Sequence, residues 1–211
     1  MRGLTIALPK GRLFENSLRL LERAGFRFPS AHGDSRRLMF TEIGGAARMI
    51  LVKPVDVVTY VEHGAADIGI VGEDVVHESG VDVLQPLTLP FGQCRIVVAG
   101  TPAQQRANLR LLTNLRVATK YPRLTRAYFT RRGLSAEIIG LSGSIELGPA
   151  IGLADLLVDV VDSGRTLRDN GLVEIETVLH SSACVIVNRA SQVMKDESIS
   201  ALVARLSDAL P

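Results

Sequence analysis

The stretch GAADIGIV, residues 64–71, is echoed by GLADLLVD at residues 152–159. Each copy begins with a glycine, which can adopt the left-handed conformation that ends a helix, and passes through Ala-Asp into an apolar strand-like run. The same helix–turn–strand pattern thus occurs twice, 88 positions apart (152−64). The repeat favours two similarly built lobes, although two ordinary helix-to-strand turns can also resemble each other by chance.

Short apolar runs alternate with helical patterns along almost the whole chain. Helices are predicted over Leu13–Ala24, Pro54–His63 and Pro122–Arg132, each ending at a glycine. Strands are predicted over Leu4–Leu8, Met49–Val52, Asp67–Val71, Arg95–Ala99, Arg116–Ala118, Glu137–Leu141, Leu156–Val161, Val173–Leu179 and Cys184–Asn188. Several of these strands are continuously apolar, as is typical of strands covered by helices on both faces. We therefore expect an α/β protein with mostly parallel sheets.

The chain contains no linker rich in Pro, Gly or Ser between its halves, so short crossing segments are expected near Phe91–Gln93 and Thr177–Ser182. Lobe I is predicted to comprise residues 1–92 and 180–211, and lobe II residues 93–179. The chain would leave lobe I, build lobe II and return for a final helix near Ser191–Leu206.

The composition excludes several classes of protein. With 211 residues, 46% of them hydrophobic, the chain can bury a full core and is not of the disordered class. Its 24 Lys and Arg against 22 Asp and Glu give a net charge of +2, which predicts neither a nucleic-acid nor a membrane-surface partner. No apolar run reaches the roughly 18 residues of a membrane helix, and the first predicted strand begins without a secretory leader. We expect a cytoplasmic protein.

Cys94 and Cys184 are the only cysteines, and neither belongs to a CxxC pair. They are expected to be buried and reduced rather than joined in a disulfide framework. The four histidines are scattered without metal-ligand spacing, so a structural zinc site is not expected.

The best candidate for anion binding follows the predicted strand Leu156–Val161. There the chain reads Asp162-Ser163-Gly164-Arg165-Thr166 before a short helix over Leu167–Asn170. Unpaired backbone N–H groups, two hydroxyls and the Arg165 guanidinium suit a monophosphate. The alternative is a helix merely capped by Ser163. Neither standard nucleotide-binding fingerprint, GxxxxGK[ST] or strand-linked GxGxxG, is present.

Four other segments carry polar groups at predicted strand ends. Lys10, Gly11 and Arg12 follow the first strand, where two cations could hold a polyphosphate or simply face solvent. Glu146 lies in a turn of small residues, where its carboxylate could accept hydrogen bonds from sugar hydroxyls or lie on the surface. The stretch 67–74 brings carboxylates and glycines to another strand end, and Arg95 opens an apolar strand and requires a carboxylate or phosphate partner.

Taken together, these segments resemble the ATP phosphoribosyltransferase family. The resemblance is carried by Lys10–Leu13, Asp56–Asp74, Gly92–Arg95, Ala118–Pro122 and, above all, Gly143–Leu172 (GSIELGPAIGLADLLVDVVDSGRTLRDNGL). It extends over nearly the whole chain, and the last segment is long and specific. The chain resembles the short form of the family, which lacks a C-terminal histidine-binding domain.

The resemblance implies a fold and a reaction. The fold would be that of type II periplasmic binding proteins, two α/β lobes with the active site in the inter-lobe cleft. The reaction would transfer the phosphoribosyl group of phosphoribosyl pyrophosphate (PRPP) to N1 of ATP, releasing pyrophosphate with Mg²⁺ as cofactor, as the first step of histidine biosynthesis. Short-form members act with a histidyl-tRNA-synthetase-like regulatory subunit in a hetero-octamer, so the resemblance also implies a homo-oligomeric catalytic subunit within it.

The resemblance also implies residue roles. The residues matching the loop for the 5′-phosphate of PRPP are Ser163, Gly164, Arg165 and Thr166. Asp159 and Glu146 match carboxylates near the ribose hydroxyls. Lys10, Gly11 and Arg12 match the segment that meets pyrophosphate. The residues expected to line the ATP side, in the other lobe, are Asp67, Gly72, Asp74 and Arg95.

The sequence departs from the family pattern at three positions. Ser163 replaces a common threonine and keeps the hydroxyl. Lys53 stands where many members have arginine, which keeps the charge but loses the bidentate fork. Gly148 replaces a common alanine, a change expected to matter little.

Two other functions compete with this interpretation. A non-catalytic two-lobe sensor would share the implied fold, and a phosphoribosyltransferase for another base would share the donor site. Turnover with ATP separates both alternatives from the ATP-specific enzyme.

Overall fold

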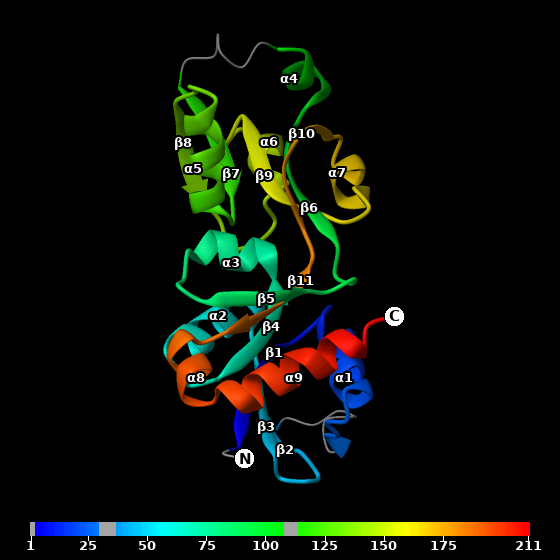
Figure 1. Cartoon of the computed structure of the whole chain (residues 1–211). Coiled ribbons are helices and arrows are strands. Elements are labelled where there is room, and N and C mark those ends of the chain that lie inside the picture. The colour runs from blue at the N-terminus through cyan, green and yellow to red at the C-terminus, as the bar shows by residue number, and fades with distance from the viewer. Residues whose placement is uncertain (1–2, 30–36, 108–113) are drawn as a thin grey trace. The chain divides into compact units, whose positions relative to one another are not determined.

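The computed structural model describes residues 3–29, 37–107 and 114–211 (Figure 1). The chain forms two compact units, unit 1 from Met1–Gly92 and Ser182–Pro211 and unit 2 from Gln93–Ser181. The first crossing lies at the predicted position. The return crossing lies two residues later than the predicted boundary between residues 179 and 180.

Unit 1 is a six-stranded sheet with helices on both faces, its strands in the order β2-β3-β1-β4-β11-β5 (Figure 1). Its strands are β1 (Leu4–Pro9), β2 (Met39–Thr41), β3 (Ala47–Val52), β4 (Ile68–Gly72), β5 (Leu84–Thr88) and β11 (Ala183–Val187). Its helices are α1 (Phe14–Arg23), α2 (Pro54–Glu62), α3 (Glu73–Ser79), α8 (Arg189–Met194) and α9 (Asp196–Asp208).

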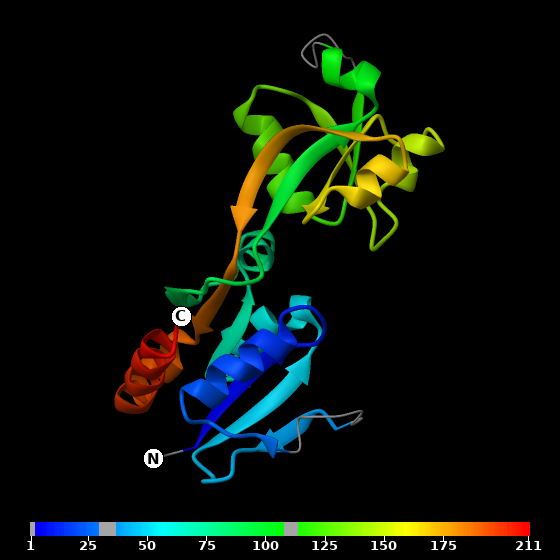
Figure 2. The same ribbon diagram turned by 90° about the vertical axis from the view of Figure 1, so that its right-hand side faces the viewer.

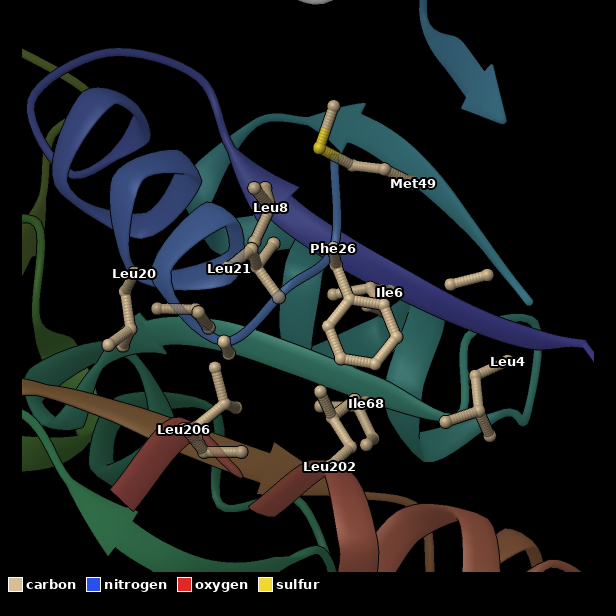
Figure 3. Close-up of a cluster of buried hydrophobic side chains, with 14 of the residues drawn as sticks. Leu4, Ile6, Leu8, Leu20, Leu21, Phe26, Met49, Ile68, Leu202 and Leu206 are labelled. Carbon is tan, nitrogen blue, oxygen red and sulfur yellow. The ribbon is translucent and has the colours of Figure 1, made fainter. Parts of the chain in front are cut away.

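Alternation along β1 divides the core of unit 1 into two layers. Ile6 packs with Leu21 of α1 and Leu202 of α9 on one face of the sheet (Figure 3). The next residue, Ala7, points to the other face and packs with Val57 of α2. Burying a side chain such as Ile6, Leu21 or Val57 stabilises the fold by roughly 1.5–3 kcal/mol. Packing in both layers therefore holds β1, and the residues at its end, in place.

Unit 2 is a five-stranded sheet in the order β10-β6-β9-β7-β8. Its strands are β6 (Cys94–Gly100), β7 (Leu115–Thr119), β8 (Ala136–Gly140), β9 (Leu156–Val161) and β10 (Val173–Ser181), and its helices α4 (Pro102–Arg106), α5 (Pro122–Arg131), α6 (Leu147–Ala150) and α7 (Arg165–Asp169). Phe129 of α5 packs on one face of the sheet, against Val117 and Val158. Leu167 of α7 packs on the other face, against Leu157.

The prediction of mostly parallel sheets was wrong, although the α/β class holds. Strand β1 is parallel to β3 and β4, and β7 is parallel to β8 and β9. The other pairings are antiparallel. The chain enters unit 2 along β6 and leaves along β10, so these neighbours run in opposite directions (Figure 2). In unit 1 the parallel strands β3, β1 and β4 are flanked on both sides by antiparallel strands, whereas in unit 2 the parallel strands β9, β7 and β8 form one side of the sheet and β6 and β10 the other.

The final helix expected near residues 191–206 is two helices, α8 and α9. They are separated at Lys195, whose φ of −131° is not helical. The Lys195 side chain is directed to the buried Asp67 carboxylate, 2.8 Å from its ammonium, and this contact fixes the break. No helix in the described parts of the chain is long and apolar enough to cross a membrane.

Candidate active site

The polar residues predicted in unit 2 gather at one edge of its sheet. Strands β7, β8 and β9 are parallel, so their carboxyl ends lie at the same edge, where α/β sheets bind ligands. The turn after β9 holds Ser163–Thr166, the loop after β8 holds Glu146, and Lys120 follows β7 directly. This edge is the candidate donor site.

The turn Ser163–Thr166 depends on a glycine. Gly164 is buried with a left-handed φ of 71°, and a Cβ there would lie 3.1 Å from Arg168 Nη1 and 3.1 Å from Glu174 Oε1. Arg168 Nη1 also donates to the Ser163 carbonyl oxygen at 3.1 Å, which holds the turn from behind. The residue that caps α7 is Gly164, without a side-chain hydrogen bond. The alternative of Ser163 as the helix cap is therefore wrong.

The side chains of this turn face solvent. Ser163 and Thr166 are exposed, and neither hydroxyl is hydrogen-bonded to a described residue. Arg165 is 83% exposed and pairs with Asp169, at 3.5 Å and one helical turn away. Such an exposed pair contributes little to stability, so the guanidinium can turn to an anion at small cost.

Two carboxylates flank the turn. Asp159 lies on β9, and its Oδ1 is 3.2 Å from Lys120 Nζ and accepts a hydrogen bond from the Val160 amide at 2.7 Å. Glu146 lies at the N-terminal boundary of α6, half-buried, without a capping hydrogen bond from its side chain. Ser144, two residues before Glu146, has a left-handed φ of 49°, unusual for a non-glycine residue.

Arg95 lies in unit 2 and not in the lobe that was expected to line the ATP side. It is the second residue of β6, opposite Val161 at the carboxyl end of β9, because the chain has already crossed at Gly92. Its Nη2 lies 2.9 Å from both carboxylate oxygens of Glu174. The partner predicted for Arg95 is thus the Glu174 carboxylate, which lies next to Gly164. The prediction that Arg95 belongs to the lobe on the ATP side was wrong.

In unit 1, the carboxyl ends of β1, β3 and β4 form a second polar edge. Lys10 and Arg12 follow β1, Lys53 follows β3, and all three are exposed. Gly11, between the first two, has a left-handed φ of 91°. Arg12 Nη2 is 3.4 Å from the Gly92 carbonyl oxygen. The carboxyl ends of β1 and β3 therefore carry three exposed cations, which suit a polyphosphate.

Strand β4 separates two residues that were predicted to act together. Asp74 lies after its carboxyl end, buried in the first turn of α3 beside Gly72. Asp67 precedes its amino end and accepts hydrogen bonds from the Thr5 amide at 2.8 Å and Ser191 Oγ at 2.7 Å. This placement corrects the grouping of Asp67 with Gly72 and Asp74, because Asp67 is at the opposite end of the strand.

The Asp67 carboxylate is a structural group. Burial alone would raise its pKa, but hydrogen bonds from Lys195, the Thr5 amide and Ser191 outweigh burial and hold the pKa below its ordinary value. The carboxylate is therefore ionised and fully occupied by protein donors.

Sequence reasoning missed Lys120 and Glu174 as site residues. Lys120 is the second residue after the predicted strand 116–118, a position that could have signalled it, whereas nothing local distinguishes Glu174. Among the described residues, no three His, Cys, Asp or Glu side chains are grouped as ligands for a metal ion.

Comparison with known proteins decides the family. The family model for ATP phosphoribosyltransferase matches residues 53–208. The chain is 49% identical to the ATP phosphoribosyltransferase of Geobacillus sp. (strain WCH70) over 208 residues, 99% of each chain. The chain belongs to the ATP phosphoribosyltransferase family. A second family member, from Bacillus subtilis (strain 168), is 47% identical over 204 residues, covering 97% of this chain and 94% of that one.

Solved structures agree with this family and with the fold. A chain of the ATP phosphoribosyl transferase (HisG:HisZ) complex from Thermotoga maritima is 35% identical with a TM-score of 0.84, covering 98% of this chain and 97% of that one. The periplasmic aliphatic sulphonate binding protein SsuA from Escherichia coli is 14% identical with a TM-score of 0.60, covering 99% and 72%. At 14% identity, the similarity to SsuA is evidence of the fold alone. It shows that this chain has a two-lobe fold like that of type II periplasmic binding proteins.

Proposed function

We propose that this protein is an ATP phosphoribosyltransferase, which transfers the phosphoribosyl group of PRPP to N1 of ATP and catalyses the first step of histidine biosynthesis. The observation that carries the proposal is 49% identity to a family member over 99% of both chains. The Ser163–Thr166 turn supports it, because two hydroxyls face solvent and the left-handed backbone at position 164 is occupied by a glycine.

Unit 2 binds the donor in this proposal. Ser163, Gly164, Arg165 and Thr166 hold the 5′-phosphate through backbone N–H groups, hydroxyls and one guanidinium. Asp159 and Glu146 accept hydrogen bonds from the ribose hydroxyls. These roles are consistent with the gathering of all six residues at the carboxyl edge of one sheet.

Unit 1 contributes the charge that the leaving group needs. Lys10, Gly11 and Arg12 meet the pyrophosphate, with Lys53 nearby at the same sheet edge, and Gly72 and Asp74 belong to the ATP side. As N1 of ATP bonds to C1′, the C1′–O bond breaks and its electron pair departs with pyrophosphate. A donor aimed at the growing charge is worth about 3 kcal/mol in comparable sites. The N1 lone pair needs no strong general base.

Mg²⁺ enters this proposal with the substrate. The described residues offer no group of three metal-ligating side chains. We expect the cation to accompany the pyrophosphate of PRPP as a counter-ion, which oxygen-rich phosphates favour.

We further propose that the chain is a short-form catalytic subunit that acts with a histidyl-tRNA-synthetase-like regulatory subunit in a hetero-octamer. The proposal is supported by the match to 97% of a chain from a structure titled as a HisG:HisZ complex. The isolated chain would then show weak or no inhibition by histidine, and tight histidine binding by this chain alone would contradict the short-form assignment.

One assay tests the function. The purified chain, with and without the regulatory subunit, is mixed with PRPP, Mg²⁺ and ATP, and pyrophosphate and N1-ribosylated ATP are followed. Formation of both products is expected. Pyrophosphate release with another base but never with ATP would indicate a different phosphoribosyltransferase. Ligand binding without turnover, even with the regulatory subunit, would indicate a sensor.

A further inference from the structure

An ion pair joins Lys120 to Asp159 at the donor edge of unit 2. Thr119, the last residue of β7, pairs with Val158 of β9, so the residues that follow them lie side by side. The Lys120 ammonium is 3.2 Å from Asp159 Oδ1. The two residues are 39 positions apart in sequence (159−120), and the parallel register of the two strands alone brings them together.

The backbone on both sides of Lys120 is fixed. Thr119 is fully buried, and its hydroxyl donates to the Val158 carbonyl oxygen at 2.7 Å and accepts from the Tyr121 amide at 2.9 Å. Thr125 of α5, also fully buried, lies 3.2 Å from the same hydroxyl. Lys120 is therefore the exposed residue between two anchored neighbours, and its position at the sheet edge is preorganised.

The two oxygens of the Asp159 carboxylate differ in their surroundings. Oδ1 accepts a hydrogen bond from the Val160 amide and forms the ion pair with Lys120. Oδ2 accepts no hydrogen bond from the described part of the chain, and the side chain is 21% exposed. One oxygen is held by the protein, and the other remains open to a ligand hydroxyl.

We propose that Lys120 is a positioning residue for the phosphoribosyl donor: its ammonium holds Asp159 Oδ1, so that Oδ2 faces the ribose hydroxyls. This inference rests on the proposed function, which gives Asp159 its role at the ribose. Lys120 acts through Asp159 and does not contact the donor itself. Since both partners are partly exposed, the pair contributes little to folding, and the effect of its loss falls on donor binding.

The test compares Lys120→Met, Lys120→Arg, Asp159→Asn and the double variant Lys120→Met/Asp159→Asn. We expect Lys120→Met to raise the KM for PRPP and its Kd, measured by calorimetry, about fivefold, which is the upper end of what a partly exposed ion pair contributes. The KM for ATP should change less than about twofold. Lys120→Arg should restore most of the loss, because it keeps a cation at the carboxylate.

The double variant separates positioning from direct contact. In the Asp159→Asn background, Lys120→Met should raise the KM and Kd for PRPP by less than about twofold, because the group through which Lys120 acts has already been changed. Arg131→Met, which removes an exposed cation from α5 in the same unit, is the matched control and should leave both KM values unchanged. Equal losses for PRPP and ATP, or full additivity in the double variant, would overturn the role of Lys120. An inactive wild-type chain that also fails to bind PRPP would instead overturn the proposed function.

Discussion

Thr5 and Asp67 close a pair of hydrogen bonds across neighbouring parallel strands. The Thr5 amide donates to Asp67 Oδ2 at 2.8 Å, and the Asp67 amide donates to the Thr5 carbonyl oxygen at 2.8 Å. Arg116 and Asp155 repeat this arrangement in unit 2, at 2.8 and 2.9 Å. The duplicated Gly-x-Ala-Asp pattern thus has a physical cause, because in each unit the aspartate fixes the register between two parallel strands.

Replacing Asp67 by asparagine should destabilise the protein by about 3 kcal/mol at neutral pH, since it leaves the Lys195 ammonium without its buried partner. The pKa of Asp67 is held below its ordinary value, so its stabilising effect is fully present above the unfolded-chain value of about 4. The effect is lost as the pH falls through the lower folded value. Urea unfolding of both proteins at pH 7 and at pH 3 measures the difference.

Two other aspartates serve as controls for this measurement. Asp82→Asn removes a pair with Arg189 whose side chains are 58% and 76% exposed, and should cost less than about 1 kcal/mol. Asp155→Asn removes the ion pair with Arg116, whose side chains are 36–40% exposed, and should lower the free energy of unfolding by an amount between the other two. Equal losses at all three positions would show that burial of the Asp67 pair has no special effect on stability.

The pattern of burial explains which parts of the fold were predictable. Strands covered on both faces are continuously apolar, and each of these was placed within one or two residues. The strands β2 and β5 were missed. Both lie at the edge of the sheet in unit 1. In β2 the side chain of Met39 is 62% exposed, and in β5 Pro86 lies in the middle of the strand. Neither sequence therefore shows the apolar pattern of a buried strand. Strand direction was also beyond prediction, because an apolar run looks the same whether its neighbour is parallel or antiparallel.

The candidate site was predictable where its residues are contiguous. The Ser163–Thr166 turn was predicted because a glycine, two hydroxyls and an arginine lie together between a predicted strand and a short predicted helix. Ion pairs between distant strands leave no local signal, so Lys120 with Asp159 and Arg95 with Glu174 emerged only from the register of the sheet.

Gly148→Ala should be destabilising, in contrast to the expectation that alanine and glycine are nearly equivalent there. A Cβ at this buried position would lie 2.9 Å from the Cβ of Ala118, itself fully buried in β7. Overpacking of this kind costs roughly 1–3 kcal/mol. Thermal unfolding should show a lower Tm for Gly148→Ala and recovery in Gly148→Ala/Ala118→Gly. The control is Gly140→Ala, where a Cβ would meet nothing within 4 Å.

The thiol of Cys184 should be inert in the folded protein. The side chain is 1% exposed, and burial, with the charges of Glu73 and Asp74 adding to it, raises the pKa of the thiol to about 12. Cys94 is free and buried as well, as predicted. Treatment with iodoacetamide at pH 8 followed by mass spectrometry should find Cys184 unmodified in the native protein and alkylated after denaturation in urea. Rapid native labelling of Cys184 would mean that β11 opens readily.

The double substitution Ser163→Ala/Thr166→Ala should weaken binding of PRPP far more than binding of ATP. Both hydroxyls are exposed on the turn that is proposed to hold the 5′-phosphate. Each hydrogen bond to a charged group is worth roughly 1.5–3 kcal/mol, so losing two should raise the Kd for PRPP by at least about 100-fold. Calorimetric titration of each substrate measures this difference. Thr130→Ala removes an exposed hydroxyl from α5 in the same unit and should change neither affinity. Equal losses for PRPP and ATP in the double variant would mean that the 5′-phosphate is held elsewhere, because removing two hydroxyls from its binding turn cannot affect both substrates alike.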